Sequence, residues 1–241
     1  MSVAEYAMRL GDDSLVLGQR LSAWCGHAPM LELDLSLSNI ALDLIGQATY
    51  FLSLAGDADQ LAFHRDVLDF RNCLLVEQPN GDFAQTIARQ FLFSHGQELL
   101  LRELASSKHA MLAGIAQKAV KEVAYHVQFA DEWVVRLGDG TEESRRRMID
   151  GLEWVWRFGD ELFDVDDKLQ DMIENAIAVD VRLLRPAWDV RIERVLARAL
   201  LKAPKSQRPI LGGRQGRHSE HLGHLLSDMQ FLPRAYPGTQ W

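Results

Sequence analysis

The sequence predicts an all-α protein, and three features of the chain support this prediction. Apolar residues recur every three or four positions over most of its length, which is the period of a helix buried on one side. Glycine and proline stand between these stretches, where helices end. No sustained alternation of apolar and polar residues and no internal repeat of about 20 to 50 residues interrupts the pattern. We therefore predict one all-α domain over residues 1–241.

This punctuation divides the chain into a series of predicted helices. Asp12 or Asp13 can cap the first helix, and Asp82 with Gln85 resembles a capping box for a later one. The opening of the second helix, MLELDLSL, alternates like a strand, but the helical period returns after it. The predicted helices cover about residues 12–24, 30–55, 59–70, 82–105, 108–137, 141–163, 164–176, 186–201 and 219–233.

The order of the long helices indicates a more specific fold. Two long helices precede the turn-rich stretch VEQPNG and two follow it, which is the layout of a ferritin-like bundle. The predicted fold class is therefore all-α, a ferritin-like helical bundle with extra C-terminal helices. Residues 203–218 form a basic loop rich in glycine and proline, and residues 219–233 form the terminal helix.

A metal site of the ferritin-like type has a motif that can be searched for. Its two metals need a Glu-x-x-His motif on each of two helices, because positions i and i+3 project to one side. None of the eight histidines has Asp or Glu three positions before it. A spacing of four occurs at Glu122/His126 and Glu220/His224, which can also share a helix face. One such pair would not hold two irons, so we predict that this chain holds no metal.

Charge and cysteine content exclude several classes of protein. The formal net charge of -8 and the pI of about 5.5 argue against nucleic acid or an anionic membrane as the main partner. Two cysteines are too few for a disulfide framework. The N-terminus has no signal-peptide layout, and no run reaches the roughly 18 apolar residues of a membrane span. We expect a cytoplasmic protein.

Several segments resemble a known family. The runs RLGDDSLVLGQRLSAWCGHAP, ALDLIGQA, LLVEQPNGDFAQTIARQF, GRHSEHLGHLLSDMQ and PGTQW span nearly the full length. On these runs the chain resembles the C subunits of bacterial multicomponent phenylacetyl-CoA 1,2-epoxidases, which are NADPH-dependent monooxygenases of aerobic phenylacetate degradation. The resemblance implies a structural, non-catalytic subunit that stabilises and shapes a catalytic A subunit of the same ferritin-like fold.

The resemblance also implies where the cofactors lie and which partners exist. The di-iron centre belongs to the A subunit, and FAD and an iron-sulfur cluster, used with NADPH, belong to the reductase. The complex also includes a small B subunit, and a contact with a second copy of this chain is considered as well. This chain itself would carry no cofactor and no catalytic residue, and it would be inactive alone.

On this resemblance, part of the chain is interpreted as the relic of a di-iron site. If DLIG occupies the place of the first Glu-x-x-His, Asp43 replaces the glutamate and Gly46 the histidine, and glycine cannot bind metal. In the later helix Val123 and His126 would stand for the second motif, with Glu122 beside them. Glu122 and His126 are expected to form a polar contact or ion pair near the core, while a single retained metal and exposed side chains stay open as alternatives.

The basic loop and the start of the terminal helix are the predicted partner-binding segment. Its sequence LGGRQGRH is rich in glycine, so we expect a partner protein, or more weakly the phosphate of the CoA ester, to order it. A zinc site made by the histidines of the terminal helix is an alternative. The residues assigned to partner binding are Arg214, Arg217, His218, Glu220 and His221.

Two functions from different classes follow. The first is the structural subunit described above. The second is a free-standing ferritin-like oxidase or oxygenase with an unusual set of metal ligands. The missing Glu-x-x-His motifs argue against the second function.

Overall fold

Helices account for all regular structure in the part of the chain that the computed structural model describes, residues 1–205 and 208–238. This confirms the all-α class. Residues 206–207 of the predicted basic loop and the last three residues of the PGTQW motif lie outside the described ranges. None of the helices in these ranges combines the length and the apolar character that crossing a lipid bilayer requires.

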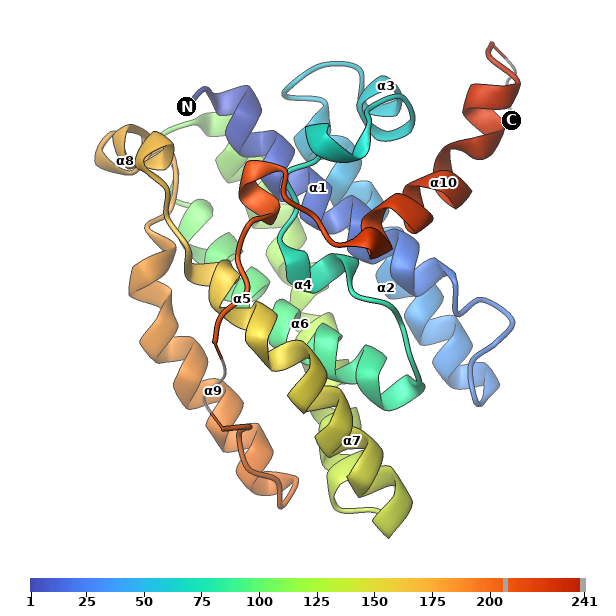
Figure 1. Ribbon diagram of the computed structural model, residues 1–241. Coiled ribbons are helices and arrows are strands. Elements are labelled where there is room, and N and C mark those ends of the chain that lie inside the picture. Colours follow the sequence, from blue (N-terminus) through green and yellow to red (C-terminus); the bar gives the residue numbers. More distant parts are fainter. Residues whose placement is uncertain (206–207, 239–241) are drawn as a thin grey trace. The chain divides into compact units, whose positions relative to one another are not determined.

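The chain divides into two compact units, and each is described by itself. The terminal unit combines Ser2–Pro79 with Gly212–Trp241, and the central unit contains Asn80–Leu211. Elements of the terminal unit are α1 (Val3–Ser22), α2 (Leu31–Leu52), α3 (Ala58–Phe63), the 3₁₀ helix η1 (Val67–Asp69), α4 (Leu74–Glu77), the 3₁₀ helix η4 (Gly213–Gln215) and α10 (Glu220–Ala235). Elements of the central unit are α5 (Phe83–Leu104), α6 (Ala110–Gly138), α7 (Glu142–Val155), η2 (Trp156–Phe163), α8 (Asp167–Glu174), η3 (Val181–Leu184) and α9 (Arg185–Arg198) (Figure 1).

Helix α1 begins at Val3, nine residues before the predicted start at residue 12. Ser2 and Glu5 form a reciprocal capping box, in which the Ser2 hydroxyl accepts from the Glu5 N–H and the Glu5 carboxylate accepts from the Ser2 N–H. The prediction that Asp12 or Asp13 caps this helix was therefore wrong. Both aspartates lie in the helix interior and are buried.

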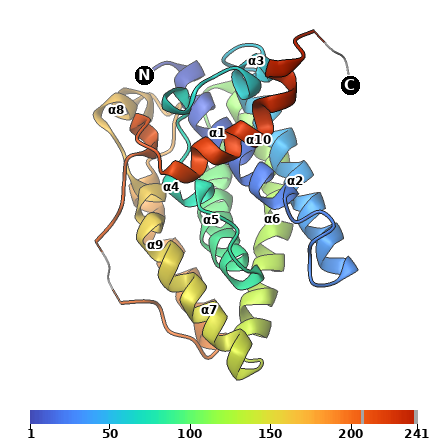
Figure 2. The same ribbon diagram turned by 45° about the vertical axis from the view of Figure 1, so that its right-hand side comes forward.

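Helices α1 and α2 lie side by side in two views of the terminal unit (Figures 1 and 2). Glycine allows the close approach at Gly18, where an added Cβ would lie 3.0 Å from Ile45 and 3.2 Å from the Ala41 carbonyl. The two helices also contribute fully buried leucine and isoleucine side chains to the core, among them Leu17, Leu21, Leu37, Ile40 and Leu44. The helical interpretation of the alternating MLELDLSL stretch is confirmed.

Other boundaries differ from the sequence prediction. The predicted helix over 59–70 is interrupted, because α3 ends at Phe63 and η1 begins only at Val67. The short helix α4 was missed, since its residues were assigned to a turn-rich connection. In the central unit, Thr141 caps α7 as predicted, but the second part of that helix, Trp156–Phe163, is a 3₁₀ helix.

Long helices α5 and α6 pair in the central unit. Asp82 caps α5 by accepting the Gln85 N–H, as the sequence predicted. Gly151 of α7 allows that helix to approach α5, since an added Cβ would lie 2.9 Å from the Gln85 Cα. Together with α1 and α2 of the terminal unit, these are the two pairs of long helices that agree with the predicted ferritin-like bundle. The single domain over residues 1–241 stays a prediction.

A charged cluster joins α9 to α5 in the central unit. The Glu98 carboxylate, which is buried, accepts from Arg102 at 2.6 Å and from Arg191 of α9 at 2.5 Å. Burial alone would raise the pKa of Glu98, but the hydrogen bonds and charges of the two arginines outweigh it and hold this pKa below its ordinary value. Ionised Glu98 therefore stabilises the folded state above the pKa of the unfolded chain, and this contribution is lost as the pH falls through the folded pKa.

Glu98→Gln should lower the free energy of unfolding at neutral pH by about 1–2 kcal/mol, because the variant keeps hydrogen bonds but loses the charge that two arginines face. The difference from wild type should narrow as the pH falls below about 4.3, where unfolded glutamate is protonated. Urea unfolding at several pH values measures this. Glu103→Gln on the same helix, at an exposed position, is the control. A deficit that stays constant into acid would contradict the assignment.

Candidate functional site

The predicted partner-binding segment is held by its own chain. Arg214 of η4 forms a bidentate ion pair with Asp13 of α1, with Nη1 3.0 Å from Oδ1 and Nη2 2.7 Å from Oδ2. Its Nη1 also donates to the carbonyls of Arg9 and Arg71. Both side chains are largely buried, at 13% and 7% exposed. A planar guanidinium has enough N–H donors to bond a carboxylate and two backbone carbonyls at the same time.

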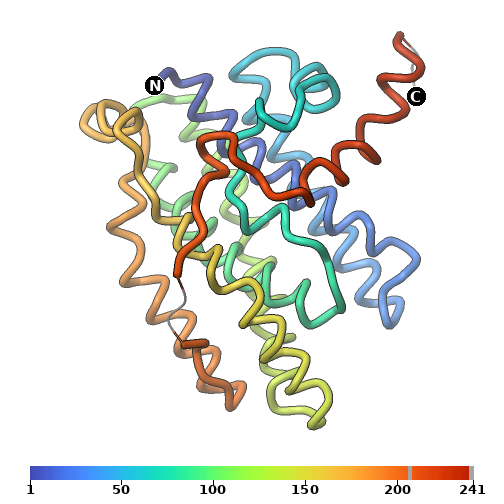
Figure 3. Tube along the Cα trace, viewed as in Figure 1, coloured from blue at the N-terminus to red at the C-terminus, as the bar shows by residue number. Residues whose placement is uncertain are grey.

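Glycines in this segment allow tight packing rather than flexibility. A Cβ added at Gly213 would lie 2.1 Å from the Asn72 carbonyl oxygen, so only glycine fits against that stretch of backbone. Gly216 has φ +77° and lies close to the Leu68 carbonyl. Contacts within the chain therefore hold the segment, and its ordering by a partner or by the phosphate of the CoA ester stays a prediction. Figure 3 follows the chain, in red, through this segment and into α10.

A second buried pair lies a few residues farther along. Glu77 of α4 is fully buried. Its carboxylate accepts hydrogen bonds from His218 Nδ1 at 2.8 Å, from the Ser219 N–H at 2.6 Å and from the Asn72 side-chain amide at 3.0 Å. The other ring nitrogen of His218, Nε2, lies 3.0 Å from the Phe70 carbonyl oxygen. Because both ring nitrogens face acceptors, this geometry suits an imidazolium that donates twice.

These contacts extend to Arg20 and Asp12, both on α1. Arg20 donates to the carbonyls of Glu77 and His221, which ties α1 to α4 and to the first turn of α10. Asp12 accepts from the Arg65 guanidinium and from the Arg71 N–H at 2.8 Å. Burial raises the pKa of Asp12, and Arg65 opposes this shift. We call this network, built on Asp12, Asp13 and Glu77, the C-terminal clasp.

The structure gives two of the five predicted partner-binding residues an internal role. Arg214 and His218 are committed to the clasp, so neither side chain is presented to a partner. Arg217 and Glu220 are exposed, and His221 is half-buried. Partner binding by these three residues stays a prediction. In the terminal helix Leu222, Leu225 and Leu226 are buried, whereas Leu232 is 48% exposed.

The acidic residues of the clasp were not predicted from the sequence, because they were assigned other roles. Asp12 and Asp13 were interpreted as helix caps, and Glu77 was placed in a turn. One signal was present in the sequence. The stretch from Val3 to Leu10 already has a helical pattern and opens with the S-x-x-E signature of a capping box, which leaves the later aspartates inside a helix.

The residues interpreted as a di-iron relic lie on one helix in each unit. In the terminal unit, Asp43 and Gly46 are half-buried on α2. In the central unit, Val123 and His126 are fully buried on one side of α6, and Glu122 is half-buried. Within the described residues, no group of three or more His, Cys, Asp or Glu side chains could hold a metal ion. The absence of a metal from this chain and the pairing between Glu122 and His126 both stay predictions.

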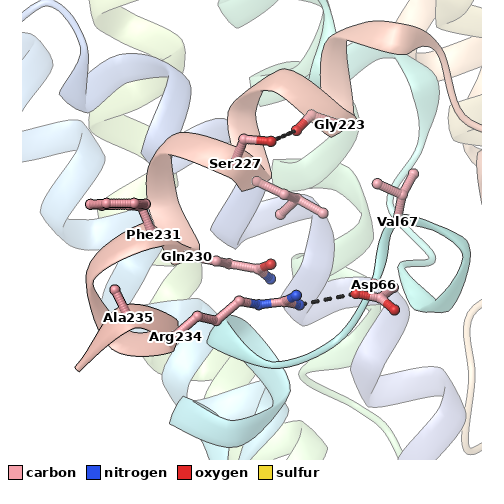
Figure 4. Close-up of a pocket in the computed structure, with 9 residues that line it drawn as sticks. Asp66, Val67, Gly223, Ser227, Gln230, Phe231, Arg234 and Ala235 are labelled. Carbon is pink, nitrogen blue, oxygen red and sulfur yellow. Dashed lines mark hydrogen bonds and ion pairs between the residues drawn. The ribbon is translucent and has the colours of Figure 1, made fainter. Parts of the chain in front are cut away.

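A groove of about 540 Å³ lies beside α10 in the terminal unit (Figure 4). Its polar side chains already hold the helix to the chain around α3, because Gln230 donates to the carbonyls of Ala62 and Arg65 and Arg234 pairs with Asp66 at 3.1 Å. Val67, Leu226 and Phe231 supply apolar walls. This composition indicates packing rather than catalysis.

Comparison with known proteins places the chain in a family. Residues 1–241 match the family described as phenylacetic acid catabolic protein, and the chain belongs to this family. A curated relative from Escherichia coli (strain K12), named as the C subunit of 1,2-phenylacetyl-CoA epoxidase, is 49% identical over 242 residues, which covers 98% of each chain.

Charge reversal by Arg214→Glu should lower the free energy of unfolding by about 3–5 kcal/mol, because it leaves Asp13 buried without its cation and adds a like charge. Arg217→Glu, three residues away on an exposed side chain, is the matched control and should change stability by less than about 0.5 kcal/mol. Urea denaturation measures both. Equal stability of the two variants would mean that the clasp does not hold the segment.

Removing both members of the second buried pair tests whether they act together. Glu77→Ala and His218→Ala should each destabilise the protein, and the double variant should lose less than the sum by about 1–3 kcal/mol. The reason is that either single change leaves the other group buried without its charge partner. Additive losses in a urea-based double-mutant cycle would rule out the coupling.

Proposed function

We propose that this chain is the C subunit of a bacterial phenylacetyl-CoA 1,2-epoxidase and serves there as a non-catalytic structural subunit. The observation that carries the proposal is the 49% identity, over 98% of both chains, to a protein named as the C subunit of this enzyme. The family match over residues 1–241 supports a place in phenylacetate catabolism.

Features of the chain support a structural role. The polar groups that the structure brings together in the terminal unit are arranged as internal pairs. Asp13 is matched to Arg214 and Glu77 to His218, with further backbone donors on each carboxylate. Such pairs hold distant segments in one arrangement. The alternative of a free-standing metal oxidase has no comparable support, since no set of three ligands is brought together in the described ranges.

The proposal includes specific partners and a location. The di-iron A subunit, the small B subunit and a reductase that carries FAD and an iron-sulfur cluster and takes electrons from NADPH would complete the enzyme. The isolated chain would be inactive and hold no metal. Two free thiols, Cys25 exposed and Cys73 buried, are typical of a reducing cytoplasm.

Co-expression with a candidate catalytic subunit tests the proposal. The two chains should elute together in size-exclusion chromatography, and NADPH-dependent epoxidation of phenylacetyl-CoA should require both, together with the small B subunit and the reductase. Elemental analysis should find iron in the complex and no stoichiometric iron in this chain alone. Full activity without this chain, or two irons per isolated chain, would overturn the proposal.

A further inference from the structure

Helix α2 has apolar residues on two opposite faces. One face is buried and contains Leu33, Leu37, Ile40 and Leu44. The opposite face carries three leucines that are exposed to solvent, Leu31 at 71%, Leu35 at 57% and Leu42 at 67%. A helix that is apolar on both sides is normally covered on both. The exposed side therefore lacks the cover that its composition indicates.

The three exposed leucines lie on one line along the helix with the half-buried Ser38 and Gly46 and the exposed Thr49. Positions separated by 4, 3, 4, 4 and 3 residues return to the same side of a helix, since eighteen residues make about five turns. None of the side chains on this line is charged. We call it the outer stripe, and it consists of Leu31, Leu35, Ser38, Leu42, Gly46 and Thr49. Alternation of leucine with small residues at this spacing matches the knobs and holes of a second helix.

Gly46 gives an independent indication of a close neighbour. Glycine is the least favourable residue in a helix interior apart from proline. In the structure an added Cβ at Gly46 would meet no described atom within 4 Å, so packing within the chain does not require glycine there. Loss of a metal ligand would explain the absence of histidine at this position but not the choice of glycine. Close approach by the backbone of another molecule would explain it.

The charge on α2 indicates which kind of partner would bind to the outer stripe. The helix contains Glu32, Asp34 and Asp43 and no lysine, arginine or histidine. A second copy of α2 would bring acidic flanks together, which is unfavourable. A helix with lysine or arginine beside its own apolar stripe would be complementary. A heterologous partner also agrees with the relative's printed designation as one subunit of an enzyme.

We propose that the outer stripe of α2 binds a long helix of the iron-bearing catalytic subunit, one whose apolar stripe is flanked by lysine or arginine. The inference rests on the proposed function and adds to it the surface through which this chain meets its partner. Leu42 lies near the middle of the contact, and Gly46 is the point of closest approach.

Leu42→Glu tests the contact directly. The dissociation constant for the candidate catalytic subunit, measured by titration calorimetry with the full chain, should rise about tenfold or more. The matched control is Leu68→Glu in η1, where the side chain is 73% exposed in the same unit, and its affinity should equal that of wild type. Both variants should keep the wild-type circular dichroism spectrum and thermal midpoint, because neither leucine is buried.

Gly46→Leu separates binding from folding. Better helix propensity should raise the thermal midpoint of the isolated chain by about 2–4 °C. The added side chain should at the same time weaken binding to the catalytic subunit about tenfold or more. A stabilised variant with weakened binding supports the proposal, because a merely structural effect would move both quantities in the same direction.

Three results would overturn the inference. If the wild-type complex forms and both Leu42→Glu and Gly46→Leu bind normally, the surface is wrong while the proposed function stands. If wild type does not bind the catalytic subunit at all, the proposed function fails together with the inference. If sedimentation shows that the isolated chain is a dimer that Leu42→Glu dissociates, the outer stripe belongs to a second copy of the chain.

Discussion

Burial of three carboxylates in the terminal unit is the constraint on which its structure depends. A charged carboxylate away from water is strongly unfavourable unless it is paired and hydrogen-bonded. Asp12, Asp13 and Glu77 are all buried, and each is paired with an arginine or histidine side chain from a segment distant in the sequence. The chain can satisfy them only by bringing the segments around residues 65, 214 and 218 back to α1 and α4. The path of the C-terminal segment follows from this requirement.

Such pairs provide geometric specificity more than net stability. Replacing a buried ion pair by apolar residues is often neutral or stabilising, whereas removing one partner is costly. The Arg214 guanidinium donates four hydrogen bonds, and the Glu77 carboxylate accepts from three donors. Few other positions of the C-terminal segment would satisfy all of these groups. In the central unit Glu98 with its two arginines fixes α9 against α5 by the same principle. A subunit whose role is to present a defined surface benefits from this kind of rigidity.

The two interfaces of α2 show how one helix can serve folding and assembly. Its inner face buries leucine and isoleucine, and its outer stripe leaves leucines in solvent. Exposed single leucines are ordinary on a protein surface, but leucines at helical spacing along one line, with a glycine that the fold does not need, mark a contact that lies outside the chain. The clasp and the outer stripe lie in the same unit but are made of different residues. The groups that order the unit are therefore separate from those that we assign to binding.

The sequence by itself determined the all-α class, the positions of the long helices α2, α5 and α6, and two caps, Asp82 and Thr141. These depend on local periodicity and on hydrogen bonds between near neighbours, which the order of residues specifies directly. It also showed the lack of Glu-x-x-His motifs, because that spacing can be checked in the chain alone. Tertiary structure decided the roles of Asp12, Asp13, Glu77, Arg214 and His218. An aspartate can cap a helix or neutralise a distant arginine, and a glycine can loosen a loop or allow tight packing, with the same local sequence. Which role applies depends on the segments that fold against them, since the energy of a buried charge is set by its surroundings in space.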